Sequence, residues 1–182
     1  ELYGAYDEQC QREGVVDFAE LLLRAYELLQ RNQPLRQHYQ QRFRHILIDE
    51  FQDTNDLQYR WLTLLAGGGA SLFAVGDDDQ SIYAFRGANV GNMAAFERDY
   101  AGPQLIRLEQ NYRSHAHILD SANHLIRQNA HRLGKDLWTD AGEGEPVRIF
   151  AAFSDRDEAQ WLLEEIRALV ADGMSRSEIA IL

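Results

Sequence analysis

The sequence has few cysteines, few lysines and no long apolar run, and each shortage excludes a class of protein. Cys10 is the only cysteine, which excludes a disulfide framework, a CxxC motif and a cysteine-based zinc site, and favours a reducing compartment. Apolar runs such as residues 71–75 are far too short to cross a bilayer, and no signal peptide opens the chain. We therefore expect a cytoplasmic protein that has no membrane partner.

Positive charge is also scarce, because 18 lysines and arginines stand against 29 aspartates and glutamates, for a net charge of −11. A chain this acidic is not expected to coat DNA through its overall field, so a nucleic-acid role would need a local basic or aromatic surface. The 182 residues are 45% hydrophobic and 26% charged, which is typical of a globular protein with one domain or two small ones. The chain starts without methionine and stops inside the apolar run 179–182, so we expect a piece of a longer protein.

A phosphate-binding loop is missing as well. The pattern GxxxxGK[ST], whose backbone amides and lysine cradle the phosphates of a nucleotide, occurs nowhere in the 182 residues. Lys135 is the only lysine, and it is followed by Asp136 rather than by serine or threonine. These 182 residues therefore contain no Walker A element.

Helix-like and strand-like stretches alternate along the chain. Apolar residues recur at helical spacing in some stretches, whereas short apolar runs bounded by polar residues or glycine indicate buried strands. This alternation predicts an α/β fold with parallel strands, and we place the domain boundary near residues 108–113. The expected helices cover residues 18–29, 56–66, 90–100, 115–126 and 155–170, and the expected strands cover residues 45–48, 72–75, 105–108, 147–153 and 179–182.

The first chemical signal is an acidic pair, Asp49 and Glu50, directly after the strand expected at residues 45–48. Ligands bind at the carboxyl ends of parallel strands in open α/β sheets. One carboxylate can hold Mg²⁺ there while its neighbour orients or deprotonates a water molecule. Taken alone, the pair fits a solvated helix start equally well.

Three segments, in this order, add to that signal: IDEFQDTN at residues 48–55, VGDDDQSIYAFRGA at residues 75–88 and LEQNYRS at residues 108–114. They resemble motifs II, III and IV of the superfamily-one DNA helicases of the UvrD/PcrA/Rep type. VDFAELL at residues 16–22 and RLGKDLWT at residues 132–139 also resemble the UvrD branch, so the resemblance covers essentially the whole chain. The run DDDQSIYAFRGA is far more specific than a lone acidic pair.

The resemblance implies nucleotide-site roles for five residues. Asp49 matches the Walker B aspartate that positions Mg²⁺, and Glu50 matches the base that activates the attacking water. Gln80 matches the motif III glutamine that senses the γ-phosphate of ATP and links it to the DNA side. Tyr112 matches a tyrosine that stacks on the nucleotide base, and Arg113 matches an arginine that reaches the γ-phosphate. An arginine suits this role because its guanidinium binds phosphate through two hydrogen bonds and stays charged.

The resemblance also assigns contacts with single-stranded DNA to Tyr83, Phe85 and Arg86. Many relatives carry tryptophan where Phe85 stands and glycine where Ala84 stands, so we expect weaker stacking on the bases rather than none. Aromatic rings beside an arginine suit sequence-independent binding of single strands without a basic field. Two plainer interpretations remain: Tyr83 and Phe85 could share a strand face, and Arg113 could be an ordinary ion-pair residue.

Two charged stretches have plainer interpretations as well. Asp77, Asp78 and Asp79 form a like-charge cluster, in which we expect at most one functional residue and otherwise a solvated loop. The basic stretch 31–44 fits a solvated helix face better than a DNA contact.

Members of this family bind ATP between two RecA-like domains, so the resemblance implies a RecA-like α/β fold of the P-loop NTPase type in two incomplete domains. Residues 1–108 would be the later part of the first domain, and residues 109–182 the start of the second. The longer protein would be an ATP-dependent DNA helicase with ATP and Mg²⁺ as cofactors and single-stranded DNA and DNA duplex junctions as partners. We expect the chain alone to be inactive without Walker A.

Other outcomes stay open at the level of the sequence. A missing sheet strand should leave unpaired edges, which we expect the fragment to close by strand exchange or dimerisation. The competing function is a non-catalytic DNA-binding or protein-interaction module that keeps the motif residues as scaffold. A helicase–nuclease relative is a third reading, although residues 132–139 favour the UvrD branch.

Overall fold

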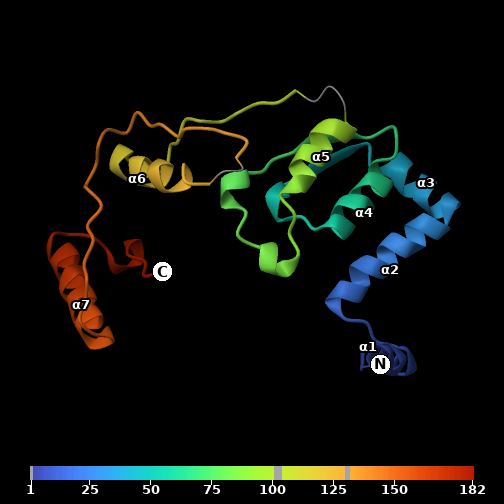
Figure 1. Cartoon of the computed structure of the whole chain (residues 1–182), viewed down its shortest axis with the longest axis horizontal. Helices are drawn as coiled ribbons and strands as arrows, with labels where there is room; N and C mark the ends of the chain where they lie inside the picture. Colours follow the sequence, from blue (N-terminus) through green and yellow to red (C-terminus); the bar gives the residue numbers. More distant parts are fainter. Residues whose placement is uncertain (1, 101–103, 130–131) are drawn as a thin grey trace. The chain divides into compact units, whose positions relative to one another are not determined.

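The chain divides into two compact units. The computed structural model describes residues 2–100, 104–129 and 132–182 (Figure 1). Unit 1 consists of Glu1–Leu108 and Ile126–Lys135, and unit 2 consists of Glu109–Leu125 and Asp136–Leu182. Among the described residues, no helix is both long enough and apolar enough to span a membrane.

Unit 1 alternates helices with two short strands, and several of its helices begin at side-chain caps. Asp17 accepts a hydrogen bond from the backbone N–H of Glu20 at 2.8 Å, and Asn55 and Gln58 form a reciprocal capping box. The elements are α1 (Leu2–Glu13), α2 (Phe18–Arg31), α3 (Gln33–Arg42), β1 (His45–Ile48), η1 (Phe51–Asp53), α4 (Asp56–Ala66), β2 (Ser71–Ala74), η2 (Asp78–Gln80), η3 (Ala84–Arg86) and α5 (Gly91–Asp99), where η marks a 3-10 helix (Figure 1).

The two strands confirm the predicted α/β class. β1 and β2 pair in parallel, with Ile46 opposite Leu72 and Ile48 opposite Ala74, and these four side chains are half-buried. The other face is exposed, since Leu47 retains 76% of its accessible surface. The expectation of fully buried strands is therefore wrong for one face, because the described residues bury only the opposite one.

The core of unit 1 lies around α4 and the segment that follows β1. Phe51 is 2% exposed, and its ring meets that of Phe96 edge-on at 5.2 Å. Helices α2, α3 and α4 pack against one another. Burial of a large aromatic ring is among the strongest single contributions to a core, so Phe51 fixes the segment directly after the acidic pair. The other buried apolar residues here are Leu29, Leu62, Leu65 and Ala66.

Unit 2 holds α6 (Ala116–Ile126, the last residue counted with unit 1), α7 (Asp155–Ala171) and η4 (Arg176–Glu178). Leu119 and Asn123 are its buried residues among those described. The side chain of Asn123 donates to the carbonyl of Leu137 at 2.8 Å and accepts from its N–H at 3.2 Å. Ser154 caps α7, which covers the helix expected at residues 155–170, but no residue of α7 is buried.

Three strand predictions are wrong. Residues 105–108, 147–153 and 179–182 contain no strand, and the pairing of unit 2 is limited to one isolated bridge between Gln110 and Trp138. A strand needs a hydrogen-bonded neighbour, and apolar composition alone does not supply one. Ile149 and Phe153 are accordingly 96% and 98% exposed.

Candidate nucleotide and nucleic-acid site

The acidic pair lies at the carboxyl end of β1, as predicted. Asp49 and Glu50 are both exposed, and the N–H of Glu50 donates to Oδ1 of Asp49 at 2.9 Å. Glu50 has φ 49° and ψ 46°, the only left-handed conformation of a non-glycine residue in the described part of the chain. Such strain persists where the surrounding contacts enforce it, and it clusters at functional sites.

Gln52 is the side chain that holds Glu50 in place. It is 1% exposed, and its Nε2 donates to Oε2 of Glu50 at 2.8 Å. Its Oε1 accepts the backbone N–H of Asp77 at 2.9 Å, so one buried amide joins the residues that follow β1 and β2. Gly76 permits this approach, because a Cβ there would lie 3.0 Å from Oε1 of Gln52.

A second set of contacts, further along the chain, joins the residues that follow β1 to those that follow β2. The carbonyl of Thr54 accepts the N–H of Asn89 at 2.9 Å and Nδ2 of Asn92 at 3.0 Å, and Asn92 is 4% exposed. Asn55 and Ala88 form an antiparallel bridge. The loop of residues 77–88, which we call the aromatic loop, is therefore anchored at both ends to residues 50–56.

The three residues assigned to DNA lie together on the aromatic loop. The rings of Tyr83 and Phe85 are 5.9 Å apart, and Cζ of Arg86 lies 5.1 Å and 5.4 Å from their centroids. Phe85 is 77% exposed. Because Ala84–Arg86 form the 3-10 helix η3, the alternative that Tyr83 and Phe85 share a strand face is wrong.

Gln80 is held within the same loop. Its Nε2 donates to Oδ2 of Asp77 at 2.8 Å, and Oδ1 of Asp77 caps η2 by accepting the N–H of Asp79 at 3.1 Å. Lys135 forms an ion pair with Asp77. Burial by itself would raise the pKa of the Asp77 carboxyl, but hydrogen bonds from Lys135 and Gln80 outweigh it and lower this pKa below its ordinary value.

The expectation that most of the aspartate cluster is a solvated loop is also wrong. Nε and Nη2 of Arg132 donate to the two carboxylate oxygens of Asp79 at 2.7 and 2.6 Å, and both side chains are 13% exposed. The N–H of Leu133 donates to Asp78 at 2.7 Å. The three carboxylates lie close enough to share a metal ion, but each already has a partner in residues 132–135. Arg132 and Lys135 thus offset two of the three negative charges in the cluster.

Tyr112 and Arg113 lie in unit 2, whereas the acidic pair, Gln80 and the aromatic loop lie in unit 1. Tyr112 is 85% exposed, and its hydroxyl donates to Oε1 of Gln110 at 2.8 Å. The side chain of Asn111 accepts the N–H groups of Arg113 and Ser114 at 2.9 and 2.7 Å, which shapes the turn before α6. Both predicted residues are therefore on the surface of unit 2.

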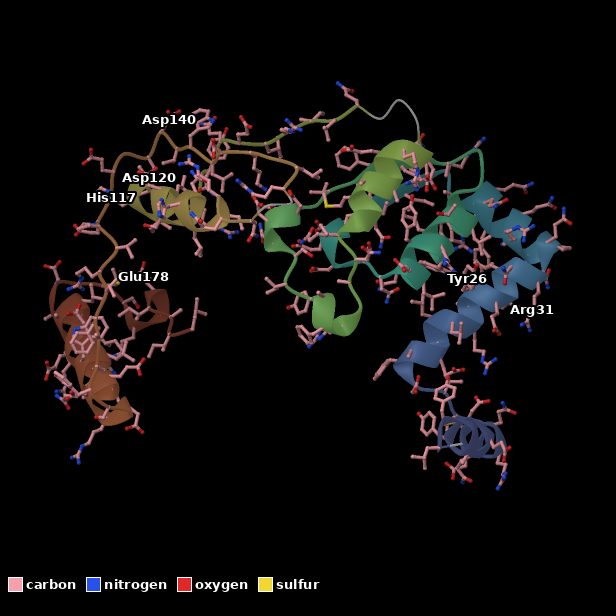
Figure 2. The ribbon with its side chains drawn as sticks, viewed as in Figure 1. Tyr26, Arg31, His117, Asp120, Asp140 and Glu178 are labelled. Carbon is pink, nitrogen blue, oxygen red and sulfur yellow. The ribbon has the colours of Figure 1, made fainter. Side chains whose placement is uncertain are left out.

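The basic stretch 31–44 serves local contacts. Figure 2 shows Arg31 on α2, where its side chain is 75% exposed and pairs with Glu27 at 3.6 Å. Arg36 donates to the carbonyl of Leu29 at 3.1 Å. These contacts fit a solvated helix face.

A divalent cation would find suitable ligands after β1. Asp49 and Glu50 offer exposed carboxylates, and Oδ1 of Asp53 is buried with no hydrogen-bond partner in the described structure. Carboxylate oxygens are the ligands that Mg²⁺ prefers, so these residues fit that ion.

Several residues that position the site were missed at the level of the sequence. Gln52 and Asn92 carry no signal of their own, because an amide that bridges two loops is recognised only once the loops are folded. Arg132 and Lys135 lie in the RLGKDLWT segment, whose resemblance to the UvrD branch assigned no role to either residue.

Comparison with known proteins agrees with the resemblance. The sequence profile of the UvrD/REP helicase N-terminal domain matches residues 1–101, and that of the UvrD-like helicase C-terminal domain matches residues 106–182. The DNA helicase II proteins of Escherichia coli (strain K12) and Haemophilus influenzae are 52% and 51% identical over 181 residues, which cover 100% of this chain and 25% of each relative. The ATP-dependent DNA helicase PcrA of Leuconostoc citreum is 42% identical over 183 residues, which cover 100% of the chain and 24% of that protein.

The chain spans about a quarter of the length of the curated relatives that it matches. The N-terminal profile covers more than half of the chain, and the two profiles follow one another in the order expected from the three motifs. The chain therefore belongs to the UvrD/REP helicase family.

Proposed function

We propose that the chain is part of an ATP-dependent DNA helicase that couples ATP hydrolysis to movement along single-stranded DNA and to unwinding at duplex junctions. One observation carries the proposal: both ends of the aromatic loop are anchored to the segment that bears the acidic pair. A change at the acidic pair would thereby be transmitted to the rings that would contact DNA. Relatives named DNA helicase II and ATP-dependent DNA helicase PcrA support this function.

Asp49 and Glu50 would serve the hydrolytic step. Bound ATP and Mg²⁺ supply the phosphoryl group that water attacks and the charge that neutralises it. Asp49 would hold the metal ion, because its carboxylate is exposed at the strand end. Glu50 would accept the proton of the attacking water, and the amide of Gln52 fixes its orientation for that task.

Gln80, Tyr112 and Arg113 would recognise the nucleotide. Gln80 would donate the second hydrogen of its side-chain amide to the γ-phosphate while the first stays bonded to Asp77. Arg113 would stabilise charge on the same phosphate in the transition state, which is worth about 10³–10⁵ in rate for an arginine in this role. The exposed ring of Tyr112 would stack on the base.

Tyr83, Phe85 and Arg86 would bind single-stranded DNA. An exposed phenylalanine ring stacks on any base, at about 1–3 kcal/mol per base, and the guanidinium adds attraction to phosphate and to the rings. This small surface would allow a chain with a net charge of −11 to bind a polyanion.

We further propose that residues 1–108 form the later part of one RecA-like domain and residues 109–182 the start of a second. The exposed sheet face with Leu47 and the unpaired apolar segment with Ile149 favour self-association or strand exchange of the 182-residue chain. Light scattering after size exclusion should give a dimer at high concentration, and a clean monomer would contradict this part. Because DNA is the substrate, we place the protein in the cytoplasm.

A chimeric protein tests the proposed role in ATP hydrolysis. This chain replaces the matching 181 residues of E. coli DNA helicase II, and ATP hydrolysis is measured with and without oligo-dT. We expect hydrolysis that oligo-dT stimulates and that Glu50→Gln reduces at least about a hundredfold. The chain by itself should show no turnover, since its 182 residues contain no Walker A motif.

The DNA contact is tested in the same chimera. Phe85→Ala should raise the oligo-dT concentration for half-maximal stimulation about tenfold, because one stacked base is lost. Phe153→Ala is the matched control, since this ring is 98% exposed in unit 2. A folded chimera without stimulated hydrolysis would overturn the proposal and favour the non-catalytic module.

A further inference from the structure

Residues 132–135 return to unit 1 between two parts of unit 2. Unit 2 ends its first part at Leu125 and resumes at Asp136, whereas Ile126–Lys135 belong to unit 1. Residues 132–135 contact all three aspartates that open the aromatic loop, and the carbonyl of Leu133 also accepts a hydrogen bond from Arg107 at 3.4 Å. We call residues 132–135 the return segment.

The contacts of the return segment are well formed and partly buried. Arg132 binds both oxygens of Asp79, and the same guanidinium donates to the carbonyl of Lys135 at 2.9 Å, which fixes the two cationic residues relative to each other. Lys135 and Asp77 are 18% and 22% exposed, so their ion pair is largely shielded from solvent. Shielded, bidentate pairs hold geometry much better than exposed surface pairs.

These contacts continue without a break to the acidic pair. The carboxylate of Asp77 binds both Lys135 and the amide of Gln80. The backbone N–H of Asp77 binds Gln52, and Gln52 binds the carboxylate of Glu50. A hydrogen-bonded path therefore runs from the return segment through Asp77 to Gln80 on one branch and to Glu50 on the other.

We propose that Arg132 and Lys135 are positioning residues that set the orientation of Gln80 and of the aromatic loop through Asp79 and Asp77. This inference rests on the proposed function, because Gln80 and the loop are the parts that would link nucleotide to DNA. The return segment is covalently continuous with unit 2 at Asp136.

The ion pair between Lys135 and Asp77 can be tested through the chemical reactivity of Lys135, because it is the only lysine in the chain. Acetylation of its side chain with an amine-reactive reagent is followed by mass spectrometry in the full 182-residue chain. Asp77→Asn should accelerate the reaction about tenfold, the factor expected when one charge-assisted hydrogen bond is lost. An unchanged rate would overturn the proposal.

The positioning role is measured in the chimera as the ratio of hydrolysis with oligo-dT to hydrolysis without it. Lys135→Gln and Arg132→Gln should each lower this ratio about tenfold, whereas Lys135→Arg should retain most of it, because a cation remains opposite Asp77. Arg12→Gln is the matched control, since Arg12 loses the same charge from an exposed pair with Glu8. A role limited to stability would lower both rates together and leave the ratio unchanged.

A charge-exchange variant keeps the test decisive if the single variants fail to fold. Exchanging the charges, with Arg132→Asp and Asp79→Arg together, should restore the ratio toward the parent value, whereas either change alone should not. Accelerated acetylation with an unchanged ratio in folded Lys135→Gln and Arg132→Gln would overturn the positioning role while the proposed function stands. A parent chimera without stimulated hydrolysis would instead overturn the proposed function, and the positioning role with it.

Discussion

Unit 1 and unit 2 differ in how many of their apolar residues are buried and in how many of their segments are joined by hydrogen bonds. Unit 1 contains five of the six buried apolar residues among those described, and its candidate residues are tied together by hydrogen bonds from three segments. Unit 2 buries Leu119 and leaves its apolar residues 147–153 unpaired. The residues of motifs II and III are thus hydrogen-bonded to other residues of this chain. The segments expected to be strands in unit 2 have no neighbouring strand among the described residues.

The largest expected effect concerns the core of unit 1. Phe51→Ala should lower the free energy of unfolding by about 3–5 kcal/mol, because a buried ring that packs on Phe96 is replaced by a cavity. Urea unfolding followed by the fluorescence of Trp61, in unit 1, measures the loss. Phe153→Ala in unit 2 should change it by no more than about 0.5 kcal/mol, and equal effects would break the contrast.

The next effect concerns the amide that joins the two loops. Gln52→Ala should cost about 1–3 kcal/mol, because the backbone N–H of Asp77 and the carboxylate of Glu50 lose a buried partner. Gln110→Ala in unit 2 serves as the comparison, since its amide donates to Asp140 at 3.0 Å in an exposed position. A smaller loss for Gln52 than for Gln110 would contradict the account.

A smaller effect is expected on acidification. The lowered pKa of Asp77 means that the unfolded chain takes up its proton more readily, so this contribution to stability is present above about pH 4 and lost as the pH falls through the folded value. Unfolding of unit 1 measured between about pH 5 and pH 3 should show this loss. Asp77→Asn should reduce the slope without abolishing it, because Asp17 and Asp99 also have lowered pKa values, and an unchanged slope would speak against the pair with Lys135.

The smallest effect belongs to an exposed pair in unit 2. Arg148 pairs with Glu165, but the arginine side chain is 66% exposed. Arg148→Ala should therefore change the free energy of unfolding by less than about 1 kcal/mol, and high salt should remove the difference. Denaturant titration followed by Trp161 would detect a larger change, which would show that unit 2 is better packed than its exposure indicates.

The sequence predicted the parts of the fold whose signals are local. The helices expected at residues 56–66 and 155–170 correspond to α4 and α7, and the strand that ends before Asp49 lies where its apolar run indicated. The strands at residues 105–108 and 147–153 were predicted wrongly, because an apolar run specifies a strand only if a neighbour is present.

The site could be predicted only as far as its motifs. The acidic pair and the aromatic loop were recognised from residue type and order, whereas the buried contacts of Gln52 and the ion pairs of Arg132 and Lys135 depend on residues far apart in the chain. The aspartate cluster was misjudged for the same reason, since its partners lie more than fifty residues away.

Hydrogen exchange of the backbone amides in the full chain tests the central claim most directly, namely that unit 1 holds the acidic pair and the aromatic loop as one body. The amides of Phe51, Asp77 and Asn89 should exchange slowly and together, because each donates across the two segments. Residues 147–153 should exchange at rates close to those of an unfolded chain. Fast exchange at Asp77 and Asn89, or equal protection in both regions, would contradict the account.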